Sequence, residues 1–332
     1  MRGQLLQKIG LREPLYLEAA EFAGIDLKQA THLANLETFD APNLGAKLAD
    51  FTTEAPKTVA DQPQTPLLTV AGLQFAYPKG RQIFTDLNLT LHHGEMVALV
   101  GRNGVGKSTL SHLIAGFLNP NAGQITLDGE DLATWSVKER ADKIGYILQD
   151  PNQMISKHLI FDEVALGPRL RGWDEDRVKS AVLSALKVCG LYPFRSWPIN
   201  ALSYGQKKRV TIAAILVLEP ALMILDEPTA GQDWRHFTDM MRFLTKLNDQ
   251  GITMMLITHD MHLMLEYAQR TIVLGDGGVL MDATPAAVLT NPDVIQHASL
   301  AQPSLYRLAK RLNLDPLAFT QAVIDQERRV RQ

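Results

Sequence analysis

Residues 101–108 constrain this chain more than any other part of its sequence. They read Gly-Arg-Asn-Gly-Val-Gly-Lys-Ser and match the pattern G-x-x-x-x-G-K-[ST]. The apolar run 96–100 precedes them and the apolar segment 109–117 follows, so the sequence predicts a strand, a turn and a helix in that order. Inward-facing amides of such a turn, together with the N-terminus of its helix, attract anionic phosphate. The pattern therefore predicts a phosphate-binding loop.

The chemistry of the loop side chains suggests their individual roles. We expect Lys107 to reach the β- and γ-phosphates of a nucleotide and the Ser108 hydroxyl to ligate Mg²⁺. Thr109 is expected beside the α-phosphate. ATP and Mg²⁺ are thus the expected ligands, and the other loop residues expected to contact the nucleotide are Gly101, Asn103, Gly104 and Gly106.

Two acidic residues follow a second apolar run. The segment 222–225 reads Leu-Met-Ile-Leu, and Asp226 and Glu227 come directly after it. Unpaired carboxylates are costly to bury, so acids at this position indicate a metal site or a strand end in a cleft. We expect Asp226 to hold Mg²⁺, directly or through water, and Glu227 to polarise the attacking water as general base. A solvated turn is the ordinary reading of such a pair, and the phosphate loop in the same chain argues against it.

A third segment, 201–209, reads Ala-Leu-Ser-Tyr-Gly-Gln-Lys-Lys-Arg. It resembles the signature motif of ABC-type ATPases, whose usual form is Leu-Ser-Gly-Gly-Gln, with Tyr204 in place of the first glycine. Gly205 is kept, so the backbone can still approach a phosphate closely. The resemblance implies that Ser203, Gly205 and Gln206 contact nucleotide.

The other landmarks of the ABC family follow in the expected order. Tyr77 resembles the aromatic residue on which adenine stacks, and Gln149 resembles the Q-loop glutamine, which touches Mg²⁺ and the lytic water. Asp233 resembles a nucleotide-contacting residue of the D-loop, with Gln232 where leucine is common. His259 resembles the catalytic switch histidine that contacts the γ-phosphate. Each of these residues alone would be interpreted as an ordinary core or loop residue. Their order along the chain favours membership of the ABC family.

The pattern from about residue 67 to 290 alternates short β-branched runs with helical segments, which is typical of an α/β sheet. The resemblance covers this region and implies a P-loop NTPase of the ABC ATPase type. Such a cassette has a RecA-like α/β core, an antiparallel β subdomain and a helical subdomain. The clear strand candidates are 95–100, 124–127, 144–148, 221–225, 253–258 and 271–274.

Helical segments are expected at both ends of this cassette. Residues 1–54 read as helices with polar joints, residues 55–66 have the composition of a linker with three prolines, and residues 291–332 form a second helical tail. The segment 11–16 and the segment 300–306 both place Leu-Tyr shortly after a proline. We therefore expect residues 1–54 to resemble the tail of a first cassette whose body is missing.

Composition limits the partners of the chain. The net charge is −3, so no chain-wide basic field recruits nucleic acid, and we expect no nucleic-acid partner. One cysteine, Cys189, excludes an internal disulfide. The longest apolar stretch, 210–218, is far shorter than the roughly 20 residues of a membrane helix. Any membrane role would therefore come from docking.

Cassettes of the ABC family work in pairs, because each ATP lies between one phosphate loop and the partner's signature motif. The chain carries one of each, which implies a second cassette, from a copy of the chain or from another protein. Segments 150–155 and 161–168 resemble the Q-loop and coupling segment of energy-coupling factor (ECF) importers. This resemblance implies a transmembrane coupling subunit and a substrate-binding membrane subunit. It also implies a peripheral location on the cytoplasmic face of the cell membrane.

The chain is closer still to the second half of the tandem ATPase of hydroxymethylpyrimidine or thiamine importers, through the segments 12–16 and 202–213. The implied function is an ATPase, a translocase that powers import of a small nutrient. The cargo expected is a vitamin, a vitamin precursor such as hydroxymethylpyrimidine or thiamine, or a transition-metal ion.

Two alternatives remain open at this point. A soluble ABC ATPase of translation or DNA repair usually carries two full cassettes or a long coiled-coil insertion, and only 94 residues separate Lys107 from Ala201. A catalytically degenerate, regulatory half-site is the second alternative, and Tyr204 is the feature in its favour.

Overall fold

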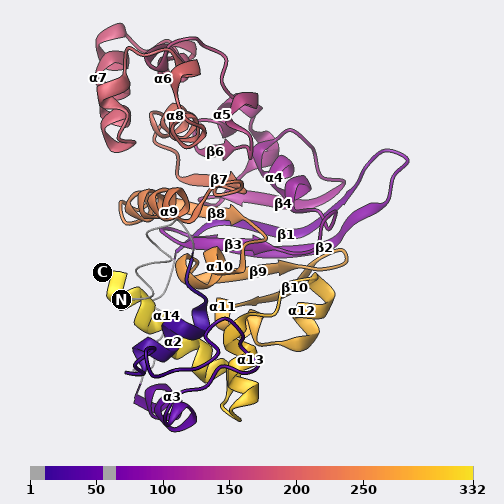
Figure 1. Cartoon of the computed structure of the whole chain (residues 1–332). Helices are drawn as coiled ribbons and strands as arrows, with labels where there is room; N and C mark the ends of the chain where they lie inside the picture. Colours follow the sequence, from indigo (N-terminus) through magenta and orange to yellow (C-terminus); the bar gives the residue numbers. More distant parts are fainter. Residues whose placement is uncertain (1–11, 55–64, 332) are drawn as a thin grey trace.

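A parallel sheet forms the centre of the molecule (Figure 1). The computed structural model describes residues 12–54 and 65–331. Its six-stranded sheet has the order β10-β9-β3-β8-β7-β6, in which β10 pairs antiparallel with β9 and the other pairs are parallel. The strands are β3 (Met96–Val100), β6 (Ile144–Ile147), β7 (Leu222–Asp226), β8 (Thr253–Ile257), β9 (Arg270–Leu274) and β10 (Val279–Ala283).

Both faces of this sheet are covered, and its central strands are accordingly apolar. β3 and β8 are buried at every position. Alternate residues of β3 enter different cores: Val97 and Leu99 join one hydrophobic cluster, whereas Ala98 and Val100 join another. This alternation follows from the two-residue period of a strand.

A four-stranded antiparallel sheet, β2-β1-β4-β5, covers one of these faces together with helix α4 (Lys107–Ala115). Apolar side chains from its long strands and from α4 share one cluster with the core sheet. The strands are β1 (Pro66–Ala76), β2 (Gln82–His92), β4 (Ala122–Leu127) and β5 (Glu130–Asp131). This layer is the expected antiparallel β subdomain.

A helical layer extends from the β6–β7 end of the sheet. Figure 1 shows α6, α7 and α8 grouped there, with α9 lying along the sheet. Their apolar faces and the facing residues of β7 and β8 form one cluster. The helices are α6 (Ile160–Leu170), α7 (Glu175–Val188), α8 (Tyr204–Leu216) and α9 (Trp234–Asn248). The short helix α5 (Val137–Arg140) precedes β6 and lies outside this cluster.

The helices at the two ends of the chain pack together at the opposite end of the molecule (Figure 1). One hydrophobic cluster contains Leu15, Phe39 and Leu48 from the N-terminal part with Leu308 and Phe319 from the C-terminal part. The helices are α2 (Leu15–Phe22), α3 (Leu44–Glu54), α10 (Met261–Tyr267), α11 (Pro285–Leu289), α12 (Pro292–Ala298), α13 (Ser304–Arg311) and α14 (Pro316–Arg331).

The similarity between the two ends extends to how their helices stop. Both α2 and α13 follow a proline and end in a left-handed residue, Gly24 or Asn313. The next amide then bonds back five residues, at 3.0 Å in the first case and 2.9 Å in the second. This is the Schellman ending of a helix. Beyond it the ends differ, because Asp315 caps α14 directly whereas an irregular segment separates Asp26 from α3.

The six strands that the sequence indicated are all present, within two residues at each end. The list of strand candidates omitted β1, β2, β5 and β10, although the alternating pattern was expected from about residue 67. β1 begins at Pro66, a residue that the sequence placed in the linker, and residues 55–64 lie outside the described part of the chain. The helix after the phosphate loop begins at Lys107 and not at Thr109, and Gly116 ends it in a left-handed conformation.

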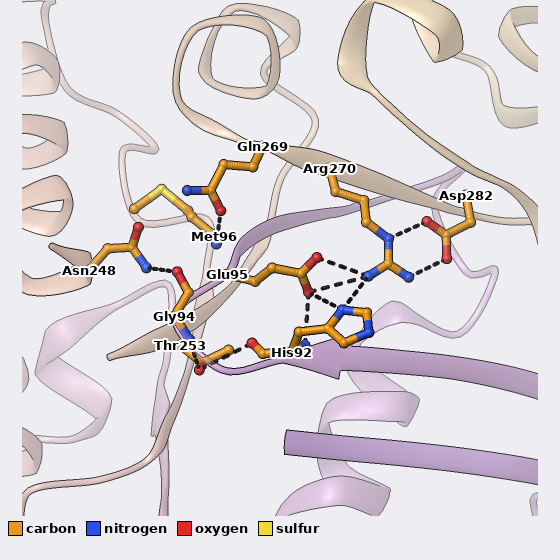
Figure 2. Close-up of polar contacts among 9 residues, drawn as sticks. All are labelled: His92, Gly94, Glu95, Met96, Asn248, Thr253, Gln269, Arg270 and Asp282. Carbon is orange, nitrogen blue, oxygen red and sulfur yellow. Dashed lines mark hydrogen bonds and ion pairs between the residues drawn. The ribbon is translucent and has the colours of Figure 1, made fainter. Parts of the chain in front are cut away.

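A buried polar network fastens the start of β3 to its neighbours (Figure 2). The carboxylate of Glu95, whose side chain is 3% exposed, accepts hydrogen bonds from the His92 amide at 2.9 Å and from Arg270 at 3.0 Å. Arg270 also forms two 2.6 Å hydrogen bonds with Asp282. The network therefore joins the end of β2 to β9 and β10.

We expect Arg270→Met to lower the free energy of unfolding by about 3 kcal/mol, because it leaves the buried Glu95 carboxylate without its guanidinium partner. The matched control is Arg81→Met, which removes an exposed ion pair with Asp276 and should cost less than about 1 kcal/mol. Chemical denaturation of both variants measures the two losses. Equal losses would contradict a structural role for the network.

Candidate active site

The predicted site residues gather where the parallel strands end. β3 leads into the phosphate loop, β6 ends two residues before Gln149, β7 ends at Asp226, and β8 ends two residues before His259. Because these strands are parallel neighbours, their carboxyl ends meet at one edge of the sheet. The fold thus brings together residues that lie up to 158 positions apart (101 to 259).

Two glycines of the phosphate loop have no room for a side chain. Gly106 has φ +116°, and a Cβ there would lie 2.6 Å from Ile83 and 2.7 Å from Phe84. Gly101 has φ +147°, and a Cβ there would lie 2.8 Å from the carbonyl oxygen of Leu274. The loop therefore packs directly against β2 and β9, which explains why glycine is needed at both positions.

Lys107 lies under this loop. Its Nζ donates to the carbonyl oxygen of Gly101 at 2.7 Å and to that of Arg102 at 3.2 Å. Burial lowers the pKa of Lys107, and the nearby Glu227 and Asp226 partly offset that effect. The ammonium is thus held at the loop and faces the acidic pair.

The remaining loop residues surround the start of α4. Asn103, Gly104 and Ser108 are exposed there, while Thr109 is buried. The hydroxyl groups of Tyr77 and Thr109 lie 3.2 Å apart. Tyr77 is 40% exposed, and its ring lies nearly perpendicular to that of Phe75, so part of Tyr77 remains accessible to a ligand.

The acidic pair lies at the end of β7. Burial raises the pKa of Asp226, and the charge of Glu227 raises it further. Glu227 is 13% exposed, and its Oε1 lies 2.6 Å from Nδ1 of His259, whose side chain is 78% exposed. Thr258 adds a 3.5 Å contact to the other carboxylate oxygen. The carboxylate is thus oriented and remains near solvent, as a general base requires.

Gln149 and Asp226 share a cavity of about 520 Å³, which Tyr204 also lines. No group of three or more His, Cys, Asp or Glu side chains within residues 12–54 and 65–331 is arranged to hold a metal. Mg²⁺ does not need one, since it is usually held by one or two carboxylates with substrate phosphates and water. The oxygens of Ser108, Gln149 and Asp226 are donors of the kind that Mg²⁺ prefers.

The signature residues Ser203, Gly205 and Gln206 line a different cavity, of about 340 Å³, with Gln232. Ser203 caps α8, because its Oγ accepts from the Gln206 amide at 3.3 Å and Gln206 returns a 3.0 Å bond to the Ser203 amide. The structure therefore separates the signature residues from the phosphate-loop group. The chain thus presents its predicted nucleotide-contacting residues on two separate surfaces.

Asp233 has a local structural role. Its carboxylate caps α9 by accepting from the backbone amide of His236 at 3.0 Å and contacts His236 Nδ1 at 2.9 Å. These hydrogen bonds, the backbone one foremost, lower the pKa of Asp233. Its predicted contact with nucleotide stays a prediction.

Two residues that contact the elements of the candidate site were not predicted from the sequence. Lys208 is buried under the Glu227 turn, and nothing in the run Lys-Lys-Arg distinguishes it from its exposed-looking neighbours. Arg12 reaches from the N-terminal part, stacks 4.2 Å over the ring of Trp234 on α9 and forms an ion pair with Glu266 on α10. It thus contacts the helix after the D-loop and the helix after His259.

Comparisons with known proteins agree with this geometry. The sequence model of a family described as ABC transporter matches residues 84–230, and that of a family described as ATP-binding cassette cobalt transporter matches residues 3–75. A Lactiplantibacillus plantarum protein assigned as an ABC transporter ATP-binding protein is 59% identical over 100% of this chain. An Enterococcus faecalis protein with the same assignment is 51% identical over 100% of it. The alignments cover 59% and 58% of those proteins, so the chain spans about three fifths of their length.

A solved structure gives the same result. It is cbiO1 from Clostridium perfringens, described as part of the ABC transporter complex cbiONQ, with 33% identity and a TM-score of 0.66. The match covers 74% of this chain and 100% of that one. The predicted P-loop fold of the ABC ATPase type is therefore confirmed, and the chain belongs to the ATP-binding protein family of ABC transporters.

Proposed function

We propose that the chain hydrolyses ATP to power an ABC importer of the ECF type. The observation that carries this proposal is the Glu227 carboxylate, held by His259 at 2.6 Å on the sheet edge that also carries the phosphate loop. A base, a lysine and a glycine loop at one edge are what phosphoryl transfer to water requires.

The chain's own residues account for the main parts of the reaction. Loop amides and Lys107 would bind the β- and γ-phosphates of ATP, and Tyr77 would stack on adenine. Glu227 would accept a proton from the attacking water, while His259 orients the carboxylate and reaches the γ-phosphate. Mg²⁺, held by Ser108, Gln149 and Asp226, would supply charge neutralisation on the phosphates.

The separate signature cavity supports a two-cassette assembly. Ser203, Gly205 and Gln206 would face the ATP of a second cassette, on a copy of this chain or on a different protein. We further propose that residues 1–54 are the tail of a first cassette, joined by residues 55–66 to the cassette 67–290 and its own tail 291–332. The matching helix ends of α2 and α13 support that reading.

A membrane role requires partner subunits in this proposal. Within the described ranges, no helix has the length and apolarity needed to cross a membrane. A transmembrane coupling subunit and a substrate-binding membrane subunit would hold the chain at the cytoplasmic face of the membrane. Of the cargoes considered, the family described as a cobalt transporter supports a transition-metal ion over a vitamin precursor such as hydroxymethylpyrimidine or thiamine.

We expect Glu227→Gln to lower kcat for ATP at least about 100-fold, because the water loses its general base. The affinity for ATP should stay unchanged, since the phosphate loop is intact. The control Glu175→Gln alters an exposed carboxylate on α7 and should leave both quantities as they are. Phosphate release and binding of a fluorescent ATP analogue measure them, and turnover near that of the unmodified protein would contradict the assignment of the base.

Uptake tests the importer and its cargo. Cells that produce the chain with its membrane subunits should accumulate ⁵⁷Co²⁺, and the Glu227→Gln variant should abolish the accumulation because it removes the energy source. Labelled hydroxymethylpyrimidine and thiamine are measured in parallel, and uptake of one of them alone would reassign the cargo to the vitamin class. If none of the three depends on Glu227, the import function is wrong.

A further inference from the structure

A buried lysine connects the signature helix with the catalytic turn. Lys208 lies in the second turn of α8, the helix that Ser203 caps. Its side chain is 1% exposed, and its Nζ donates to the carbonyl oxygens of Glu227 and Pro228, at 2.8 Å each. A side chain on one functional surface therefore holds the backbone of the other.

The turn that Lys208 holds is strained. Glu227 has φ +44°, in the left-handed region, which is unfavourable for a non-glycine residue. Pro228 follows it and restricts its conformation further. Two hydrogen bonds outside the turn fix the peptide groups of Glu227: its amide donates to the Ile257 carbonyl at 2.9 Å, and its carbonyl accepts from Lys208.

The charge of Lys208 also lies close to the acidic pair. Burial lowers its pKa to about 8, although Glu227, Asp226 and Asp150 favour the charged form. The ring of Tyr204 covers the ammonium with its centroid 5.7 Å from Nζ. Tyr204 in turn donates to the Gln149 carbonyl at 3.0 Å, so the start of α8 contacts both the Q-loop and the catalytic turn.

We propose that Lys208 is a positioning residue for Glu227 and that it links the signature surface of the chain to its own catalytic base. The inference rests on the proposed ATPase function. A phosphate that engages Ser203 displaces the start of α8, and Lys208 transmits that displacement to the carbonyl of Glu227. The carboxylate on the same residue then moves relative to His259, so each chain couples the two nucleotides that it contacts.

The test is Lys208→Met, which keeps the apolar stem and removes the donors. In the complex of the chain with its second cassette, kcat should fall between about 10-fold and 100-fold, as expected for a displaced reacting group. KM and the binding of a fluorescent ATP analogue should stay the same. Lys179→Met, which alters an exposed lysine on α7, is the matched control and should change nothing.

A double-mutant cycle separates positioning from a general structural effect. In a Glu227→Gln background, Lys208→Met should have no further effect on residual turnover, because the base that it positions is gone. Equal fold-losses in both backgrounds, or a raised KM with unchanged kcat, would overturn the proposal. If Lys208→Met does not fold, Lys208→Gln, whose shorter side chain ends in an uncharged amide in place of the ammonium that donates to both carbonyl oxygens, must show the same dependence on Glu227.

Measurements on the unmodified complex distinguish failure of the proposed ATPase function from failure of the proposed role of Lys208. Absence of any ATP turnover in it overturns the proposed function and this inference together. Turnover in it that Lys208→Met leaves unchanged overturns the role of Lys208 alone.

Discussion

Parallel pairing of β3 with β8 and β9 is the constraint on which the rest of the molecule depends. Val97 pairs with Met255 and with Arg270, and this register sets the height at which each strand ends. Because the strands are parallel, the phosphate loop after β3 and the histidine after β8 emerge at the same edge. The Glu95 network at the opposite edge then fixes β2, β9 and β10 to the start of β3.

The sequence could predict where the candidate site residues lie because the pattern that marks them is local in the chain. Asp226 and Glu227 come directly after one apolar run, and Lys107 belongs to the glycine loop that follows another. The ends of both strands could therefore be located from apolarity. β2 was missed because polar residues interrupt its apolar ones, so it lacks the continuous apolar run by which the other strands were located. β10 was missed because it is an edge strand with no fully buried position.

Contacts across long sequence separations could not be predicted. Lys208 looks like a surface residue beside Lys207 and Arg209, and it is buried only because β7 happens to end beneath α8. The packing of the N-terminal helices against the C-terminal helices could not be predicted either. Gly24 and Asn313 indicate where two of these helices end, but the hydrophobic core that the helices share comes from residues nearly 300 positions apart. Tertiary packing determines these contacts, and the local sequence pattern does not reveal them.

The contact between Glu227 and His259 has a consequence for protons. An ionised carboxylate only accepts hydrogen bonds, so Nδ1 of His259 must carry the shared hydrogen. A neutral imidazole then has a bare Nε2, and a phosphate oxygen, itself an acceptor, gains nothing from it. To donate to the Glu227 carboxylate and to the predicted γ-phosphate at once, His259 would therefore have to be an imidazolium. The protonation state of the exposed His259 ring would thus decide whether it contacts the Glu227 carboxylate alone or also a phosphate.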